Sequence, residues 1–120
     1  GRVFETDGHH VKGAAAVMDK DFAAGLLAQQ VQADTLISRT AVEKVAIRFG
    51  KPDVQWLDSL TPKQAEGYIA AGEFAPGSML PKVQAAVEFA RSAPDRTALI
   101  TLLEKAKDGV QGKTGTLIRQ

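Results

Sequence analysis

The chain has 120 residues, 44% of them hydrophobic and 24% charged, which suits one globular domain with a hydrophobic core. Fifteen Lys and Arg against fourteen Asp and Glu leave a net charge of +1, so the basic surface of a nucleic-acid-binding protein is not expected. The absence of cysteine excludes disulfides and thiolate metal sites and favours a cytoplasmic location, and no apolar run is long enough to predict a membrane partner.

Residues 1–13 are predicted to form a hairpin-like lead-in to a single domain that spans residues 1–120. Segments 2–5 and 10–12 flank Asp7-Gly8, a dipeptide typical of the type I′ turn. His9 and His10 are neighbours and would point to opposite faces of a strand, and no third ligand lies nearby. We therefore predict no metal site.

From residue 14 onward, short apolar segments alternate with helical patterns. The first predicted helix covers residues 22–32, with an apolar face made by Ala23, Leu26, Leu27 and Val31. Further helices are predicted over residues 62–71, 81–92 and 102–108, and strands over residues 35–38, 45–49, 97–101 and 115–118. This alternation predicts an α/β fold with a mainly parallel sheet covered on both faces.

The helix over residues 62–71 has the most complete end signals. Thr61 is its predicted N-cap, Pro62 occupies the first helical position, and Gln64 completes a capping box. Gly72 is expected to end the helix in the left-handed conformation.

Two lysines near helix starts indicate a phosphate site. Ligands collect at the carboxyl ends of parallel strands, and the loops expected there are residues 18–21, 39–44 and 74–82. Lys20 lies between Asp19 and Asp21 at a predicted strand-to-helix turn, and Lys82 follows a loop of small residues at the next helix start. A lysine at a helix start is unfavourable for the helix dipole unless an anion is present. We expect both lysines to converge on one phosphate with Asp21 holding both, as phosphoryl transfer requires; a capped turn with a solvated lysine is the alternative.

Trp56 and Tyr68 are the only residues of their types. Neither is interleaved with basic residues, as a single-strand nucleic-acid site would require. Packing in the core or in an interface is the role predicted for both.

Four segments, in this order and spacing, resemble carbamate kinase, a member of the amino-acid kinase superfamily. They are Val17-Met18-Asp19-Lys20-Asp21, residues 49–52 (FGKP), residues 72–83 (GEFAPGSMLPKV) and residues 112–116 (GKTGT). The resemblance runs from about Gly13 to Ile118 and corresponds to the C-terminal, nucleotide-binding half of that enzyme. It implies a three-layer αβα sandwich, a homodimer, and reversible phosphoryl transfer between carbamoyl phosphate and Mg-ADP that gives ATP and carbamate.

The resemblance also implies roles for particular residues. The lysines matching Lys20 and Lys82 contact the transferred phosphoryl group, and the aspartate matching Asp21 orients them. The family's N-terminal half carries a glycine-rich carbamate site and a further lysine, so this chain alone is expected to be inactive. The nucleotide-binding positions are Thr40, Ala41, Val45, Ala75, Pro76, Gly77, Ser78 and Met79.

The loop after the strand at residues 35–38 departs from the family pattern. Ala41 stands where the family has an acid, Ala46 where it has an aromatic residue, and Arg48 where it has an asparagine. These changes leave two alternatives open. One is a non-catalytic relative that acts as a binding or assembly protein. The other is an amino-acid kinase with a different acyl acceptor, such as acetylglutamate. The sequence of the loop at residues 74–82 argues against this second alternative.

Overall fold

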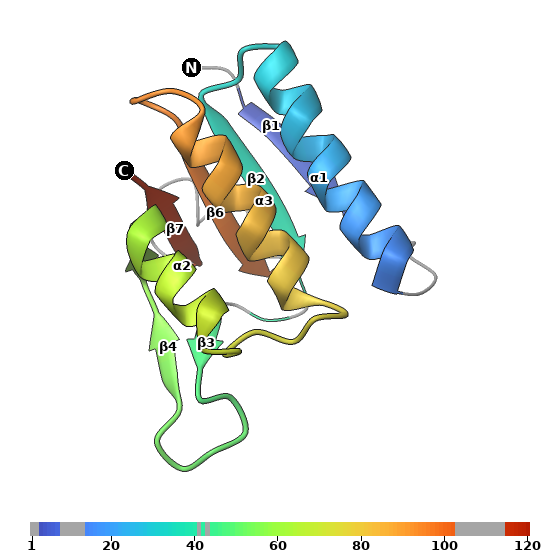
Figure 1. The fold of residues 1–120 in the computed structure, drawn as a ribbon. Helices are drawn as coiled ribbons and strands as arrows, with labels where there is room; N and C mark the ends of the chain where they lie inside the picture. Colours follow the sequence, from blue (N-terminus) through green and yellow to red (C-terminus); the bar gives the residue numbers. More distant parts are fainter. Residues whose placement is uncertain (1–2, 8–13, 41, 43, 103–114) are drawn as a thin grey trace.

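The computed structural model describes the backbone of residues 3–7, 14–40, 42, 44–102 and 115–120, and the side chains of these residues from Asp21 onward. Figure 1 shows a twisted sheet with helices packed against it and a small two-stranded ribbon that projects from one end. The elements in chain order are β1 (Val3–Asp7), α1 (Ala14–Gln30), β2 (Thr35–Thr40), β3 (Val45–Ile47), β4 (Gln55–Leu57), β5 (Ser59–Leu60), α2 (Pro62–Ala70), α3 (Met79–Arg91), β6 (Thr97–Leu102) and β7 (Thr116–Arg119).

The main sheet has five strands in the order β1-β2-β6-β7-β5. β1, β2 and β6 are parallel to one another, β7 is antiparallel to β6, and β5 is parallel to β7. Thr40 pairs with Leu102, so β2 and β6 end together at one edge of the sheet. The predicted α/β class with a mainly parallel sheet is confirmed.

β1 belongs to the main sheet, where it pairs in parallel with β2. Its place in the sheet therefore does not depend on the predicted hairpin. The second half of the hairpin-like lead-in, residues 10–12, lies outside the described residues, as do His9 and His10.

Figure 1 shows α1, α2 and α3 on the same side of the sheet. Leu36, Ile100 and Ile118 project from the sheet into a core that includes Val83 and Phe89 of α3. Because side chains alternate along a strand, Ile37 and Leu99 point to the other face, where they form a separate buried pair. Leu102, the predicted start of the helix over residues 102–108, belongs to β6, and residues 103–108 lie outside the described residues.

The prediction for α1 was wrong in two respects. The helix begins at Ala14 rather than near residue 22, so Lys20 and Asp21 lie within it and not at its N-terminus. The predicted apolar face is also exposed, and the buried stripe contains Asp21, Gly25 and Ala28 instead. Small residues face α3 because the two helices approach closely there: a Cβ atom built on Gly25 would lie 3.7 Å from the carbonyl oxygen of Ala85. The members of the predicted apolar face, all of them exposed, are Ala23, Leu26, Leu27 and Val31.

The capping box of α2 is confirmed. The Gln64 backbone N–H donates to Thr61 Oγ1 over 3.1 Å, and the Thr61 N–H donates to Gln64 Oε1 over 3.0 Å. Pro62 is the first helical residue, and Gly72 has a φ of 74° just after the C-cap at Ala71.

The predicted strand at residues 45–49 is shorter than expected and belongs to a second sheet. β3 pairs only with β4 in that sheet, in antiparallel register, and the turn between them contains the predicted break at residues 50–53. β4 and β5 were not predicted. They are three and two residues long, too short to show an apolar repeat.

Candidate active site

A buried ion pair joins the start of α3 to α1. Lys82 Nζ lies 3.3 Å from Asp21 Oδ1, with side-chain exposures of 8% for the lysine and 3% for the aspartate. Burying two opposite charges costs desolvation energy that the attraction between them only partly returns. A buried ion pair is therefore weak evidence that these residues stabilise the fold. Charged groups buried in this way are common at functional sites.

The loop before α3 presents Lys82 at the helix start. Ser78 is the N-cap, and its side chain makes no capping hydrogen bond. Instead, the backbone N–H groups of Ser78 and Leu80 donate to the carbonyl of Ala75, which turns the chain into the helix. Lys82 then lies in the first turn of α3, where the helix dipole adds to its positive charge.

The structure brings together two of the three residues predicted to be catalytic, Asp21 and Lys82. Lys20 directly precedes Asp21 in α1, but its side chain lies outside the described part of the chain. Its approach to the same point remains a prediction.

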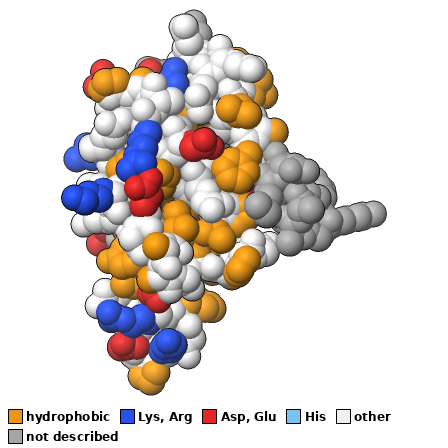
Figure 2. Space-filling view, in the orientation of Figure 1, with side chains coloured by type: hydrophobic (Ala, Val, Ile, Leu, Met, Phe, Trp, Pro, Cys, Tyr) orange, Lys and Arg blue, Asp and Glu red, His pale blue; other side chains and the backbone are white. Residues whose placement is uncertain are grey.

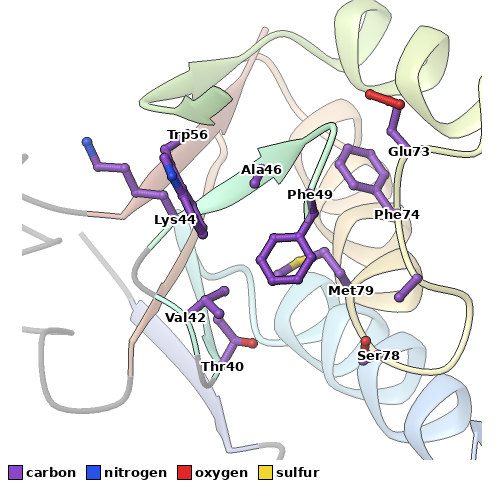
Figure 3. A pocket seen from close by; sticks show the side chains of 11 residues that line it. Thr40, Val42, Lys44, Ala46, Phe49, Trp56, Glu73, Phe74, Ser78 and Met79 are labelled. Atoms are coloured by element: carbon purple, nitrogen blue, oxygen red, sulfur yellow. The ribbon is translucent and has the colours of Figure 1, made fainter. Parts of the chain in front are cut away.

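A cavity of about 210 Å³ opens at the end of β2 and the start of α3 (Figure 3). Its wall is mostly apolar and comes from the segment after β2, the β3–β4 hairpin and the loop between α2 and α3. Met79, which lines the cavity, and Lys82 are three residues apart on α3, a rise of about 4.5 Å along the helix axis. The lining residues are Thr40, Val42, Lys44, Ala46, Phe49, Trp56, Glu73, Phe74, Ala75, Ser78 and Met79.

Half of the predicted nucleotide-binding residues line this cavity, namely Thr40, Ala75, Ser78 and Met79. Val45 does not; it is fully buried in the core, and its N–H donates to Thr116 Oγ1 over 2.8 Å. Pro76 and Gly77 are exposed on the same loop but do not line the cavity, and Ala41 lies outside the described residues.

Sequence reasoning missed the two exposed aromatic residues among those that line the cavity. Phe49 and Trp56 are 65% and 49% exposed, and their rings meet edge to face with centroids 5.9 Å apart. Trp56 therefore does not pack in the core, and its predicted role in an interface stays a prediction, whereas Tyr68 does pack against the core. The signal that locates Trp56 is its cross-strand partner Ala46, which becomes visible only once β4 is known.

Polar contacts fasten the rim of the cavity. Glu73 Oε2 accepts a hydrogen bond from the backbone N–H of Arg48 over 3.2 Å, which links the hairpin to the loop before α3. Arg48 also approaches Asp53 within 3.5 Å, and Lys44 pairs with Asp58. An apolar cavity within one helical turn of a buried lysine suits a ligand that joins a flat apolar ring to an anionic group.

Two further observations bear on the class of site. No helix in the described ranges combines the length and the apolar character needed to cross a membrane. Within those same ranges, no group of three or more His, Cys, Asp or Glu residues is placed to hold a metal ion.

Comparison with known proteins identifies the family of the chain. A model of the amino acid kinase family matches residues 3–101, so the chain belongs to that family. Within the family it is a homologue of the carbamate kinases, which confirms the resemblance seen in the sequence. It is 60% identical over 114 residues to carbamate kinase-like protein YqeA of Escherichia coli K12, covering 95% of this chain and 37% of the relative. It is 50% identical over 97 residues to carbamate kinase 1 of Enterococcus faecium, covering 81% of this chain and 31% of the relative.

A solved structure agrees with the sequence matches. Carbamate kinase from Giardia lamblia bound to AMP-PNP superimposes with a TM-score of 0.81 at 37% identity, over 95% of this chain and 36% of that one. The chain thus spans about a third of the length of the relatives that it matches.

Proposed function

We propose that the full-length protein is a carbamate kinase and that this chain supplies its nucleotide-binding and phosphoryl-transfer side. The observation that carries the proposal is the buried pair of Lys82 and Asp21 one helical turn from an apolar cavity. The similarity to a carbamate kinase bound to AMP-PNP supports the placement of a nucleotide here.

In the proposed reaction, a terminal phosphate oxygen of ADP attacks the phosphorus of carbamoyl phosphate. The bond between that phosphorus and the carbamate oxygen breaks, and carbamate leaves with the electron pair. Magnesium enters as part of the nucleotide substrate. The protein contributes position and positive charge, which matter most in this kind of transfer.

Most of the predicted site residues have a part in this scheme. Lys82, together with Lys20, stabilises the negative charge on the phosphoryl group in transit, and Asp21 holds the lysines in place. Because Lys82 is buried, its charge acts with little screening by water. The base of the nucleotide occupies the cavity beside Thr40, Ala75, Ser78 and Met79. The proposal further takes the protein to be a homodimer, as the resemblance implies, and cytoplasmic, as the absence of cysteine favours.

The test is an assay of the purified full-length protein for ATP formation from carbamoyl phosphate and Mg-ADP, with acetyl phosphate as the control donor. We expect ATP with carbamoyl phosphate and little with acetyl phosphate. A well-folded protein that forms no ATP from carbamoyl phosphate contradicts the proposal.

One observation favours a second candidate, a non-catalytic carbamate kinase-like protein that acts as a binding or assembly partner. Ala46 forms part of the cavity wall at a position where the resemblance implies an aromatic residue. Calorimetry with Mg-ADP on the full-length protein separates the candidates. Absence of binding at millimolar nucleotide, in a folded sample, favours the non-catalytic protein.

A further inference from the structure

A buried hydroxyl on β2 has no hydrogen-bond partner. Ser38 is 3% exposed, and no donor or acceptor among the described residues reaches its Oγ. A buried hydroxyl without a partner costs free energy that an apolar side chain at the same place would not. One explanation of such a group is a partner that is present only while the protein works.

Ser38 lies below the seam between α1 and α3. β2 is placed between β1 and β6 in the sheet, α1 contacts β1, α3 contacts β2 and β6, and the two helices contact each other. Figure 1 shows the two helices side by side above these strands. Lys82 and Asp21 join the helices across this seam.

The helix-facing side of β2 changes character along the strand. Leu36 belongs to the core, whereas Thr40 at the carboxyl end lines the cavity. Because alternate residues of a strand share a face, Ser38 lies between these two on the same side. The register agrees, since Ser38 pairs with Ile100 of the same core. The hydroxyl is therefore at the boundary between the core and the proposed site.

The ion pair and Ser38 also lie at a similar level of the sheet. Asp21 precedes the end of α1 at Gln30 by about 13.5 Å of helix rise. Ser38 follows the start of β2 at Thr35 by about 10 Å of strand rise. The short connection at residues 31–34 reverses the chain between helix and strand, so the two distances are measured from the same end.

The charges of the ion pair differ from those at the surface. Figure 2 shows Lys, Arg, Asp and Glu side chains mainly over α2 and around the β3–β4 hairpin, where water and salt screen them. Lys82 and Asp21 are buried, and hydrogen bonds to them are stronger in such surroundings. A carboxylate accepts several hydrogen bonds and a hydroxyl donates one. The Ser38 hydroxyl is therefore a suitable donor for the Asp21 carboxylate.

We propose that Ser38 is a positioning residue for the phosphoryl transfer, and that its hydroxyl donates a hydrogen bond to the Asp21 carboxylate when a phosphoryl group is bound. This inference rests on the proposed function and adds a residue to it. As Lys82 turns N–H groups toward the phosphoryl oxygens, Asp21 shares its cation with the substrate. The bond from Ser38 then holds the buried carboxylate, and through it the lysine, in the geometry that transfer requires.

The test is steady-state kinetics of ATP formation by the full-length protein and its variants. Ser38→Ala is expected to lower kcat by about tenfold, the scale of one hydrogen bond to a charged group. The KM values for ADP and carbamoyl phosphate should change by less than about twofold, because the hydroxyl acts on the transfer and not on binding. Ser38→Thr keeps the hydroxyl and should retain most of kcat. Without substrate, Ser38→Ala should unfold at or above the parent denaturant midpoint, because the hydroxyl has no partner there.

Thr101→Val provides the matched control. Thr101 is equally buried and its Oγ1 also has no partner, but it follows Ile100 in β6 and so points to the opposite face of the sheet. Its kcat should equal that of the parent. A parent-like kcat for Ser38→Ala, or equal losses in Ser38→Ala and Ser38→Thr, would overturn the role of Ser38 and leave the kinase proposal standing. If the folded parent protein forms no ATP from carbamoyl phosphate, the proposed function and the role of Ser38 both fail.

Discussion

Lys82 of α3 and Asp21 of α1 form an ion pair with an Nζ–Oδ1 distance of 3.3 Å, and water reaches almost none of either side chain. The pair therefore joins two helices of the core. Its lysine also supplies positive charge to the phosphoryl transfer proposed for the site. Loss of one partner leaves the other charged, buried and uncompensated, which costs far more than loss of a surface ion pair.

Asp21→Asn is expected to lower the free energy of unfolding by about 3–5 kcal/mol, the range for breaking a buried ion pair from one side. Chemical denaturation of the full-length protein measures this change. Asp53→Asn is the matched control, because Asp53 pairs with Arg48 at the surface and its loss should cost about 1 kcal/mol or less. Equal stabilities for the two variants would contradict a buried pair.

Lys82→Ala is expected to lower the rate of phosphoryl transfer about a hundredfold or more, the scale lost with one preorganised contact to a transition-state charge. The readout is kcat for ATP formation from carbamoyl phosphate and ADP. Lys63→Ala serves as the control, since Lys63 is exposed on α2 and should leave the rate unchanged. Parent-like turnover of folded Lys82→Ala protein would remove the lysine from the mechanism.

Local signals determined which parts of this fold were predictable. The start of α2 was found because Thr61, Pro62 and Gln64 act within one turn of each other. The buried face of α1 was missed because close packing on α3 selects small residues such as Gly25, whereas the sequence pattern gives most weight to large apolar ones such as Leu26. Tertiary packing thus overrode the apolar periodicity.

The same contrast between local sequence signals and tertiary packing applies to the site. The meeting of Asp21 and Lys82 followed from placing two loops at the carboxyl ends of strands, even though Asp21 lies within its helix. The aromatic side of the cavity was not predictable, because it depends on the pairing of Ala46 with Trp56 across a hairpin whose second strand is three residues long.

Two buried threonines should respond in opposite directions to replacement by valine. Thr101 Oγ1 is buried and has no hydrogen-bond partner among the described residues, so Thr101→Val should raise stability by about 1 kcal/mol. Thr116 Oγ1 accepts from the Val45 N–H and donates to the Leu57 carbonyl over 2.6 Å. Thr116→Val should therefore lower stability by about 1–3 kcal/mol. Thermal and chemical denaturation of both variants provide the comparison, and a change of the same sign in both would contradict it.

Gly115 at the entrance to β7 is expected to tolerate no side chain. Its φ is 85°, and a Cβ atom there would lie 3.0 Å from both the carbonyl oxygen of Ile100 and the Cβ of Thr101. Gly115→Ala should therefore lower the free energy of unfolding by about 2 kcal/mol or more, because left-handed strain and steric overlap add together. Gly67 in α2 provides the control, since a Cβ atom there meets nothing within 4 Å. Gly67→Ala should raise stability by about 0.5–1 kcal/mol through the higher helix propensity of alanine. Denaturant midpoints of the two variants should therefore fall on opposite sides of the parent value, and a parent-like midpoint for Gly115→Ala would show that the turn before β7 can relax.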